Sequence, residues 1–389
     1  MIQTPVYLDN NATTPLDMRV WEAMTPYLLK HFGNASSRSH AYGWEAAEAV
    51  DYAREQVARL IHAEPKEILF TSGATEACNL ALKGVSETYI DKGNHIITVS
   101  TEHSAVLETC GRLEKNGARV TRLAVNSEGL IDMKDLEAAI TPETILIAAM
   151  YANNETGVIQ PIREIGALSK KHGVLFFSDA TQALGKIPVD VIADHIDLLA
   201  LSAHKIYGPK GVGALYVRRK NPRVRLTAQI DGGGHERGLR SGTLNVPGIV
   251  GLGKACELCQ LYLQSDQAHF KTLTETLESA LLQIEGISLH GHPRQRLSNV
   301  TNVGFRIPGG ENLLSSLSPY LAISSGSACA SDQPKLSHVL AAMGVDESES
   351  RASLRFSVGR MTTREEIDFA IETIRQAVGK IEKDASQNA

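Results

Sequence analysis

Short runs of apolar residues recur along the first half of the chain, and longer amphipathic stretches separate many of them. The patterns at 133–140 and 162–173 have the spacing of helices. Nearly continuous apolar runs that alternate with helices are typical of a largely parallel sheet covered by helices on both faces. We therefore predict an α/β fold with strands at 67–73, 95–100, 118–125, 144–150, 174–180 and 198–204.

The pattern changes near residue 255, where a long helical stretch is followed by further strands and a closing helix. This order favours a smaller α+β domain. A chain of 389 residues also exceeds what one core usually supports. We predict a large domain over 15–255 and a small domain formed by 1–14 and 256–389, with strands at 287–291, 298–305, 321–329 and 352–359 and the closing helix at 363–383.

Hydrophobic residues make up 43% of the chain and charged residues 21%, which is typical of a soluble globular protein. The formal net charge of −5 gives no general attraction to nucleic acid or to an anionic membrane. We expect no secretory signal and no membrane span, because no apolar run approaches ~20 uncharged residues. Five scattered cysteines do not resemble a disulfide framework, so a reducing cytoplasm is the expected compartment.

Polar side chains follow five of the six strands predicted for the large domain. In an open parallel sheet, ligands bind beyond the carboxyl ends of the strands, so these polar groups should gather at one edge. That edge is the predicted site, and its members are 72–76, 102–104, 153–157, Asp179, Thr181, Gln182, Ser202, His204 and Lys205.

The stretch TSGATEACN (71–79) passes from a strand through Gly73 into a helix that begins near Thr75. Free backbone N–H groups at the positive end of a helix bind phosphate well. No Gly-Lys-Ser/Thr follows, so this is not a Walker A loop, and a simple N-capped helix is the alternative. Because of the other polar groups at the same edge, we interpret the turn as a phosphate site.

Asp179 and Lys205 end two of the predicted strands. Asp179 could cap the next helix, or it could pair with a protonated ring nitrogen. Such an ion pair contributes roughly 4 kcal/mol at about 4 Å and an effective dielectric near 20, or about three pKa units. Lys205 could extend to solvent, but in a partly desolvated pocket its amine becomes a nucleophile. With the phosphate site, the two residues favour a Schiff base between Lys205 and pyridoxal phosphate.

His103 emerges at the same edge, where it either forms structural hydrogen bonds or stacks on the cofactor and transfers protons. The stretch SSGSACASDQPK (324–335) surrounds Cys329 with small residues and has no apolar periodicity. A cytosolic cysteine that forms no disulfide, binds no metal and takes no part in catalysis is usually buried in apolar surroundings. We therefore expect an exposed, mobile loop that carries a reactive thiol.

Two further stretches each have two interpretations, and one arginine is a candidate ligand. CELC (256–259) lacks the second ligand pair of a metal site and is interpreted as a helix face, so no metal is predicted. The glycine-rich DGGGHERGLRSGT (231–243) is either a flexible connector or, through its arginines and Thr243, a phosphate or subunit contact. Arg355 is a candidate clamp for a substrate carboxylate.

Taken together, the motifs of this chain resemble those of a known enzyme family. The chain resembles the pyridoxal-phosphate-dependent cysteine desulfurases of the IscS/NifS group, which are class V aminotransferase-like enzymes of fold type I. The resemblance covers almost the whole chain, and the motifs are highly specific as a set. They are YLDNNATTP, FGNASSRSHAYG, FTSGATEACNLALKG, TEHSAVL, NNETGVIQPI, DATQALGK, SAHKIYGPKGVGALY, GGGHERGLRSGT, SSGSACAS and LRFSVGR.

The resemblance implies a role for each matching residue. Lys205 would bind the cofactor aldehyde, Asp179 would pair with the pyridinium nitrogen, and Gln182 would bond the ring hydroxyl. His103 would stack on the ring and transfer protons, and Cys329 would accept the sulfur. The implied phosphate ligands are Thr75, Ser202 and His204, with Thr243 from the neighbouring subunit of a homodimer, and the implied ligands of the substrate carboxylate are Asn154 and Arg355.

The implied reaction converts L-cysteine to L-alanine and leaves a persulfide on Cys329. The implied partner is a sulfur-acceptor protein, for iron–sulfur cluster assembly or for sulfur modification of tRNA or DNA. Two departures bear on that partner. Cys329 is followed by ASDQPKLSHVL where relatives typically carry Ser-Leu-Glu-Pro-Ser, and the chain ends on KDASQNA without an aromatic tail. We expect contacts to acceptors to differ accordingly.

Three other functions compete with this interpretation. A selenocysteine lyase shares the fold and nearly the same site, and comparing turnover on the two amino acids separates them. A conventional aminotransferase has no need for a loop cysteine. A non-catalytic scaffold that binds pyridoxal phosphate and sulfur-trafficking partners is disfavoured by the presence of both Lys205 and Cys329.

Overall fold

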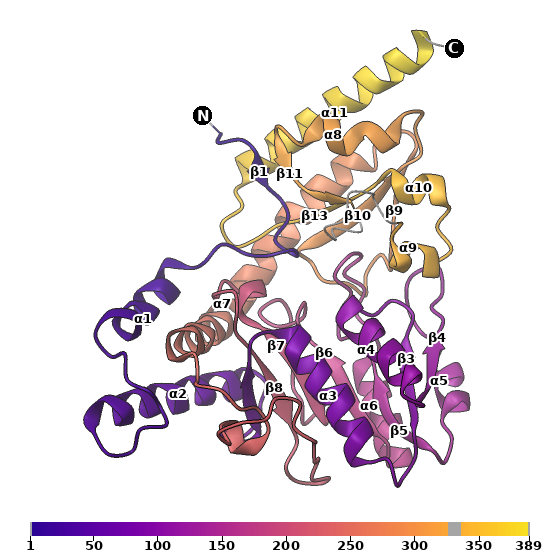
Figure 1. Ribbon diagram of the computed structural model, residues 1–389. Coiled ribbons are helices and arrows are strands. Elements are labelled where there is room, and N and C mark those ends of the chain that lie inside the picture. Colours follow the sequence, from indigo (N-terminus) through magenta and orange to yellow (C-terminus); the bar gives the residue numbers. More distant parts are fainter. Residues whose placement is uncertain (1, 326–335, 388–389) are drawn as a thin grey trace.

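The computed structural model describes residues 2–325 and 336–387. Within these residues, the larger sheet has seven strands in the order β2-β8-β7-β6-β5-β3-β4 (Figure 1). Neighbouring strands are parallel except at β8, which runs antiparallel to both β2 and β7. The strands are β2 (Ile68–Thr71), β3 (His95–Val99), β4 (Arg119–Leu123), β5 (Thr144–Ala148), β6 (Leu175–Asp179), β7 (Leu198–Ser202) and β8 (Gly213–Val217).

All six strands predicted for this sheet are present, and the α/β class with a mostly parallel sheet is confirmed. Every residue of β3, β5, β6 and β7 is buried, which explains why their apolar runs are continuous rather than alternating. The prediction missed β8. Residues 203–212, with one turn of 3-10 helix but no α-helix, connect this strand to β7, so the alternation of strand and α-helix gives no sign of it.

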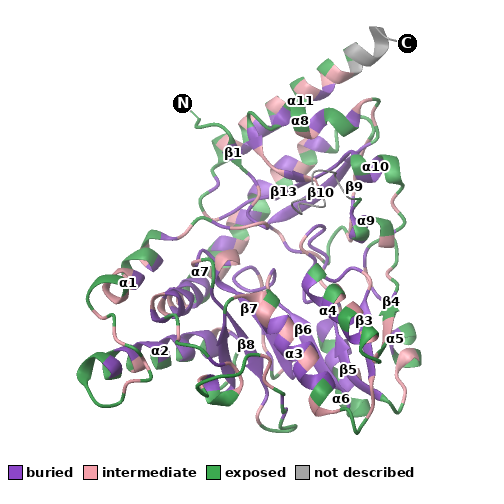
Figure 2. Ribbon diagram, in the orientation of Figure 1, coloured by how far each residue is buried: buried purple, intermediate pink, exposed green. Residues whose placement is uncertain are grey.

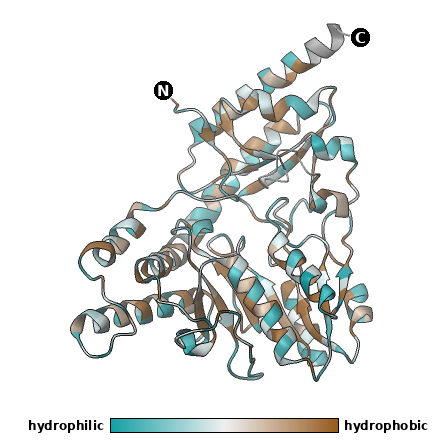
Figure 3. Ribbon diagram, in the orientation of Figure 1, coloured by the Kyte–Doolittle hydropathy of each residue, from teal (hydrophilic) through white to brown (hydrophobic). Residues whose placement is uncertain are grey.

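Helices cover both faces of this sheet (Figures 1 and 2). Side chains of α1, α2, α5, α6 and the first part of α7 pack on one face, and those of α3 and α4 pack on the other. Apolar residues concentrate in the sheet and polar residues on the outer turns of the helices (Figure 3). The helices are α1 (Met18–Leu29), α2 (Ala41–Leu60), α3 (Ala74–Thr88), α4 (Ser104–Lys115), α5 (Met133–Ala139), α6 (Ile162–His172) and α7 (Val246–Leu281).

A second core lies around an antiparallel sheet whose described strands have the order β12-β13-β10-β9. The later part of α7, together with α8 and α11, packs its apolar side chains against this sheet. The elements are β9 (Ile287–Leu289), β10 (Val300–Phe305), α8 (Leu313–Leu317), β11 (Leu321–Ala322), β12 (Ser324–Ser325), α9 (His338–Ala342), α10 (Glu347–Arg351), β13 (Ser353–Ser357) and α11 (Arg364–Gln387).

The 36-residue helix α7 contributes to both cores. Its side chains up to Cys259 join the core of the larger sheet, and those from Phe270 onward join the second core. The division between residues 255 and 256 falls within this helix and stays a prediction.

The N-terminal segment contacts both parts of the molecule. β1 (Val6–Tyr7) pairs in parallel with β11, and Asp9 bridges to Ser357 of β13. Two residues further on, the carbonyl of Asn11 accepts a hydrogen bond from Lys205 at the end of the larger sheet. No helix in the described part of the chain is long and apolar enough to span a membrane.

Candidate active site

A cavity of about 600 Å³ lies at the carboxyl ends of β2, β5, β6 and β7. This is the edge at which the sequence predicts the site. Most of the predicted residues line it, and Arg355 joins them from β13. The predicted residues along its wall are Thr75, His103, Asn154, Asp179, Gln182, Ser202, His204, Lys205 and Arg355.

The turn before α3 forms one end of this cavity. Gly73 adopts φ +154° and is the N-cap of α3, where no side-chain cap is present. A methyl group on Gly213 of β8 would lie 2.7 Å from the Cα atom of Gly73, so a glycine there lets the turn sit against the sheet. Thr75 of α3 and Ser202 also line the cavity, and the Ser202 hydroxyl lies 3.9 Å from where a methyl group on Gly73 would be. Uncapped helical N–H groups beside two hydroxyls are a suitable site for a phosphate.

His204 lies beside this end of the cavity, and its Nδ1 atom is 3.1 Å from the Thr13 hydroxyl. Burial lowers the pKa of His204 to about 4, with the positive charges of Lys205 and Lys210 as smaller causes. The imidazole is therefore neutral at pH 7. It can bond a phosphate oxygen only by donating an N–H group, not as a cation.

The amine of Lys205 is held by the N-terminal segment. Its Nζ atom donates to the carbonyl oxygens of Asn11 at 2.5 Å and Ala12 at 2.7 Å. The pKa of Lys205 is lowered to about 8, mainly by burial and in part by the positive charge of Arg355, while Asp179 acts in the opposite direction. A lysine with this pKa has roughly a tenth of its amine uncharged at pH 7, which makes it a usable nucleophile and base.

Asp179 ends β6 and is 6% exposed. Its Oδ1 atom accepts a hydrogen bond of 2.9 Å from the backbone N–H of Thr181, and the Cys78 thiol lies 3.9 Å from Oδ2. Burial raises the pKa of Cys78 well above its ordinary value, so this thiol stays protonated. A carboxylate fixed in this way is suited to pair with a cationic ring nitrogen.

Gln182 also lines the cavity, and its amide is bonded on both sides. Its Nε2 atom donates to the Asn11 carbonyl at 2.9 Å, and its Oε1 atom accepts from the Lys186 amine at 2.6 Å. Asn11 in turn donates to the Asn154 carbonyl at 3.1 Å. The N-terminal segment thus connects three residues of the predicted site.

His103 is the N-cap of α4, and its Nδ1 atom accepts a hydrogen bond of 3.1 Å from the Ala105 N–H. This bond leaves Nε2 as the protonated nitrogen of the neutral ring. Burial lowers the pKa of His103 below its ordinary value. A second imidazole, His338, lines the same cavity and donates from Nε2 to the carbonyl of Glu102 at 2.9 Å.

Arg355 is 4% exposed and is already partly paired. Its Nη2 atom contacts Asp9 at 2.6 Å and the Ser324 hydroxyl at 3.1 Å, and its Nη1 atom donates to the Asn154 carbonyl at 3.0 Å. A substrate carboxylate would therefore meet a guanidinium whose orientation is fixed by Asp9 and Asn154.

Cys329 lies outside the described residues, but the described residues on either side of that segment contact residues of the cavity wall. On the N-terminal side, β12 pairs with β13 at Arg355, a cavity residue. On the C-terminal side, the Ser337 hydroxyl donates to Glu155 Oε2 at 2.5 Å. Glu155 also lines the cavity, and burial raises its pKa to about 7.

Thr243 is exposed and does not contribute to the described wall of this cavity. The prediction assigns it to the site of a second subunit, so its role stays a prediction.

Asn11, Ala12 and His338 line the cavity but were not assigned to the site from the sequence, whereas Glu155 lies within the predicted range 153–157. The polar run after β1 and the histidine nine residues after Cys329 were the available signals. Neither signal says which part of the fold these residues contact.

The residues present fit pyridoxal phosphate. The cavity offers an amine, a buried carboxylate and a hydroxyl-lined helix start in one volume. In addition, the hydroxyl of Thr181, which lines the same cavity, is buried and has no hydrogen-bond partner among the described residues. Unpaired buried polar atoms are uncommon in folded proteins, and a polar ligand would satisfy this one.

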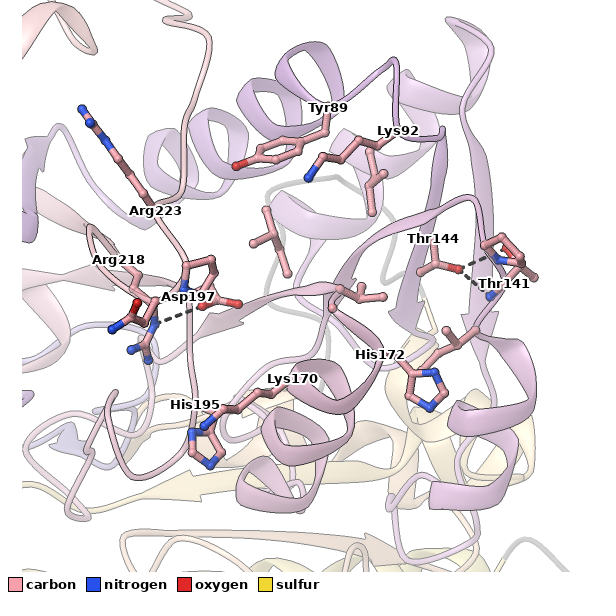
Figure 4. Close-up of a pocket in the computed structure, with 18 of the residues that line it drawn as sticks. Tyr89, Lys92, Thr141, Thr144, Lys170, His172, His195, Asp197, Arg218 and Arg223 are labelled. Atoms are coloured by element: carbon pink, nitrogen blue, oxygen red, sulfur yellow. Dashed lines mark hydrogen bonds and ion pairs between the residues drawn. The ribbon is translucent and has the colours of Figure 1, made fainter.

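A second cavity of about 870 Å³ lies at the opposite edge of the sheet, near the amino ends of β5, β6 and β7 (Figure 4). Lys170 and His172 border it from the last turn of α6, where positive charge complements the helix dipole. Its one carboxylate, Asp197, is paired with Arg218 at 3.0 Å. This cavity is larger, but none of the residues predicted for the site lines it.

The remaining cysteines of the described chain are buried. Cys256 and Cys259 lie on α7 in the core of the larger sheet, which confirms the interpretation of CELC as a helix face. Within the described residues, no group of three histidine, cysteine or acidic side chains is arranged to hold a metal ion.

Comparison with known proteins gives consistent results. The aminotransferase class-V family model matches residues 6–369. A relative named cysteine desulfurase IscS from Neisseria meningitidis is 53% identical over 380 residues, which cover 98% of this chain and 94% of the relative. A relative of the same name from Klebsiella pneumoniae is 50% identical over 382 residues, with the same coverage.

Solved structures are similar over most of the chain. A NifS-like protein superposes with a TM-score of 0.88 at 39% identity, covering 97% of this chain and 100% of that one. A structure of SspA in complex with cysteine has a TM-score of 0.81 at 39% identity and covers 92% of this chain and 100% of its own. DndA from Streptomyces lividans has a TM-score of 0.76 at 36% identity, with 89% and 97% covered.

The sheet order, the cavity at its carboxyl edge and these comparisons agree with one another. The chain belongs to the class V aminotransferase family and, within it, to the IscS/NifS group of cysteine desulfurases.

Proposed function

We propose that this chain is a cysteine desulfurase that uses pyridoxal phosphate to remove sulfur from L-cysteine and releases L-alanine. The observation that carries the proposal is a single cavity lined by the Lys205 amine, the Asp179 carboxylate and the Arg355 guanidinium. These groups serve the cofactor aldehyde, its ring nitrogen and the substrate carboxylate. Relatives 50% and 53% identical that bear the name cysteine desulfurase support the same activity.

The cofactor, when bound, supplies an electron sink for the carbanion at the substrate Cα atom. We infer that Lys205 binds its aldehyde, that Asp179 pairs with its ring nitrogen and that Gln182 bonds its ring oxygen. The phosphate would be held by Thr75, Ser202 and His204, with Thr243 contributed by a second copy of the chain.

The residues of the chain then bind the substrate and move its protons. Arg355 and Asn154 orient the carboxylate of L-cysteine. The amine of the substrate would replace Lys205 at the cofactor aldehyde. The Lys205 amine released in this way, partly uncharged at pH 7 because of its pKa of about 8, would then take the proton from Cα. His103 is neutral at pH 7 because burial lowers its pKa, so it can donate a proton from Nε2 or accept one there after donation.

We infer that Cys329 accepts the sulfur. It follows Ser325 by four residues, which span at most about 14 Å when extended, and the neighbouring Ser324 hydroxyl lies 3.1 Å from Arg355 of the cavity wall. In the transfer, the Cys329 thiolate attacks the substrate sulfur, an S–S bond forms and the C–S bond breaks. The electron pair stays on the substrate carbon, which then takes up a proton. The products are alanine and a Cys329 persulfide, so no external oxidant or reductant is needed.

The persulfide needs an acceptor. We propose a sulfur-acceptor protein, either an iron–sulfur scaffold or an enzyme that modifies tRNA or DNA with sulfur. We also propose a homodimer in the cytoplasm, with a large domain over 15–255 and a small domain over 1–14 and 256–389. Direct binding of nucleic acid or of a membrane is not part of the proposal, given the net charge of −5.

Reduction with borohydride tests the assignment of Lys205. The wild-type chain with pyridoxal phosphate should gain a covalent adduct on Lys205, found by peptide mass spectrometry, and Lys205→Ala should lose both the adduct and turnover. An adduct at another lysine in the wild type would contradict the assignment.

The second half of the reaction is tested on Cys329. Cys329→Ala should bind the cofactor as the wild type does but form no persulfide when given L-cysteine. Cys110→Ala, at a buried cysteine outside the cavity, is the matched control and should keep persulfide formation. Cysteine-derived sulfur on another cysteine of the wild type would refute the role of Cys329. Turnover on selenocysteine that exceeds turnover on cysteine would instead favour the lyase.

A further inference from the structure

Lys186 is a buried amine that the mechanism above does not use. It lies four residues after Gln182 and is 6% exposed, and it is not part of the cavity wall. Its Nζ atom donates to Gln182 Oε1 at 2.6 Å and to Asn11 Oδ1 at 3.2 Å. Both acceptors are neutral amide oxygens.

A buried lysine without a carboxylate partner is costly unless it loses its proton. No ion pair of Lys186 occurs within residues 2–325 and 336–387. Burial lowers the pKa of Lys186 well below its ordinary value, and repulsion from Lys205 and Arg355 acts in the same direction. Lys186 donates hydrogen bonds whether its amine is charged or neutral, so its presence here is explained by what it donates to.

Two neighbours together determine which way the Gln182 amide faces. An amide can rotate to exchange its oxygen and nitrogen, but the Asn11 carbonyl can only accept a hydrogen bond and so requires the amide nitrogen, while Lys186 donates to the amide oxygen on the other side. The amide nitrogen then faces the Asn11 carbonyl at 2.9 Å. One N–H group of Nε2 is used in that bond, and the other remains for a ligand in the cavity that Gln182 lines.

Asn11 is itself held in place, which makes the arrangement rigid. Its Oδ1 atom also accepts from Asn299 at 2.9 Å, and its backbone N–H donates to the Ser357 hydroxyl at 2.9 Å. Asn11 and Asn299 are each 1% exposed. The orientation of the Gln182 amide is therefore fixed by groups from three separate parts of the chain.

We propose that Lys186 is a positioning residue that keeps the N–H donor of Gln182 directed at the cavity, so that the site selects the cofactor with its ring oxygen deprotonated. This inference rests on the proposed function, because the ring oxygen belongs to pyridoxal phosphate. Lys186 contacts neither cofactor nor substrate and acts only through Gln182 and Asn11.

A double-mutant cycle tests the proposal on the full-length chain. Lys186→Met keeps the volume and removes the donor. It should weaken pyridoxal phosphate binding about tenfold, as expected for the loss of an oriented hydrogen bond to a charged oxygen, and move absorption from the long-wavelength to the short-wavelength form. Lys186→Gln keeps an N–H donor at this position, so it should keep part of the wild-type cofactor affinity and part of the long-wavelength absorption. In Gln182→Leu, the further change Lys186→Met should alter neither property by more than about twofold.

The controls separate positioning from folding. Lys171→Met removes an exposed lysine on α6, away from the cavity, and should leave cofactor binding and the spectrum unchanged. Urea unfolding should show that Lys186→Met still folds cooperatively, because methionine fills the volume of the lysine even though Gln182 Oε1 loses a donor. The proposal would be overturned if Lys186→Met bound the cofactor and absorbed light as the wild type does. It would also be overturned if the losses of cofactor affinity in Lys186→Met and Gln182→Leu multiplied in the double variant, because the two residues would then act independently. If the wild type bound no pyridoxal phosphate, the proposed function would fail as well.

Discussion

Burial is the main cause of the shifted pKa values of three residues around the cavity, Lys205, His204 and Glu155. Burial lowers the pKa of Lys205 to about 8 and of His204 to about 4, and it raises the pKa of Glu155 to about 7. In each residue, burial favours the uncharged form. Neutral bases and neutral acids in one volume are suited to proton transfer near pH 7.

Glu155 gives a prediction on stability. Its folded pKa of about 7 lies above its ordinary value of 4.5, so between these pH values the folded state binds more protons than the unfolded state. The free energy of unfolding should therefore fall as pH rises from about 4.5 to 7, by up to ~3 kcal/mol from this group. Glu155→Gln removes the titration while keeping an acceptor for Ser337. It should raise the free energy of unfolding in urea at pH 8 and leave it nearly unchanged at pH 4.5.

The control is Glu22→Gln, an exposed position on α1, which should show no pH-dependent difference. An equal gain at both pH values for Glu155→Gln would show that burial does not shift its pKa as described.

At the scale of elements, short connections place the reactive groups. Strands β6 and β7 end on Asp179 and Ser202, and their parallel pairing brings both ends to one edge. The antiparallel strand β8 then returns beside β7 and puts Gly213 against the turn at Gly73. The phosphate site therefore depends on β8, the strand that the apolar pattern did not predict.

Gly213→Ala tests this dependence. The added methyl group would contact the Leu201 carbonyl and lie 2.7 Å from the Cα atom of Gly73, so β8 or the turn must move. We expect a loss of about 1–3 kcal/mol in unfolding free energy, measured in urea, together with weaker cofactor binding. Gly111→Ala in α4 is the matched control, because nothing lies within 4 Å of its added methyl group. It should stabilise the chain by up to about 1 kcal/mol. Equal behaviour of the two variants would contradict the argument.

At the scale of the whole molecule, the cavity joins distant parts of the chain. Lys205 bonds the carbonyl of a residue 194 positions earlier, and Arg355 pairs with Asp9, 346 positions away. Arg360 likewise contacts Asp266 on α7 at 2.7 Å and Asp17 at 3.2 Å. The N-terminal segment thus links the two cores beside the site.

The proposed homodimer gives a prediction at this scale. If Thr243 completes the site of the neighbouring copy, Thr243→Asp should repel the phosphate there, and homodimers of Thr243→Asp or of Lys205→Ala should both be inactive. A heterodimer of the two, purified with two tags, has one complete site and should recover about half of wild-type desulfurase activity. An inactive heterodimer of normal mass by light scattering would place Thr243 outside the partner's site.

The local pattern of apolar and polar residues was enough to predict many of the strands and several of the site residues. Burial on both faces made β3, β5, β6 and β7 visible as continuous apolar runs, and strand ends drew attention to Asp179 and Lys205. Motif resemblance added the expected roles, and the comparisons confirmed the group. These results depend on near neighbours in the chain, which is why sequence alone could provide them.

Tertiary structure decided what those residues contact. The strand order, the position of β8, the Asn11 and Ala12 carbonyls on Lys205 and the Asp9 pair of Arg355 all join residues that are remote in sequence. Burial and hydrogen-bond orientation also arise only after packing, and they set the pKa of Lys205 and the direction of the Gln182 amide. The sequence by itself determined which chemical groups are available, and the packed chain determined their protonation and geometry, because both depend on the removal of water by residues from elsewhere in the chain.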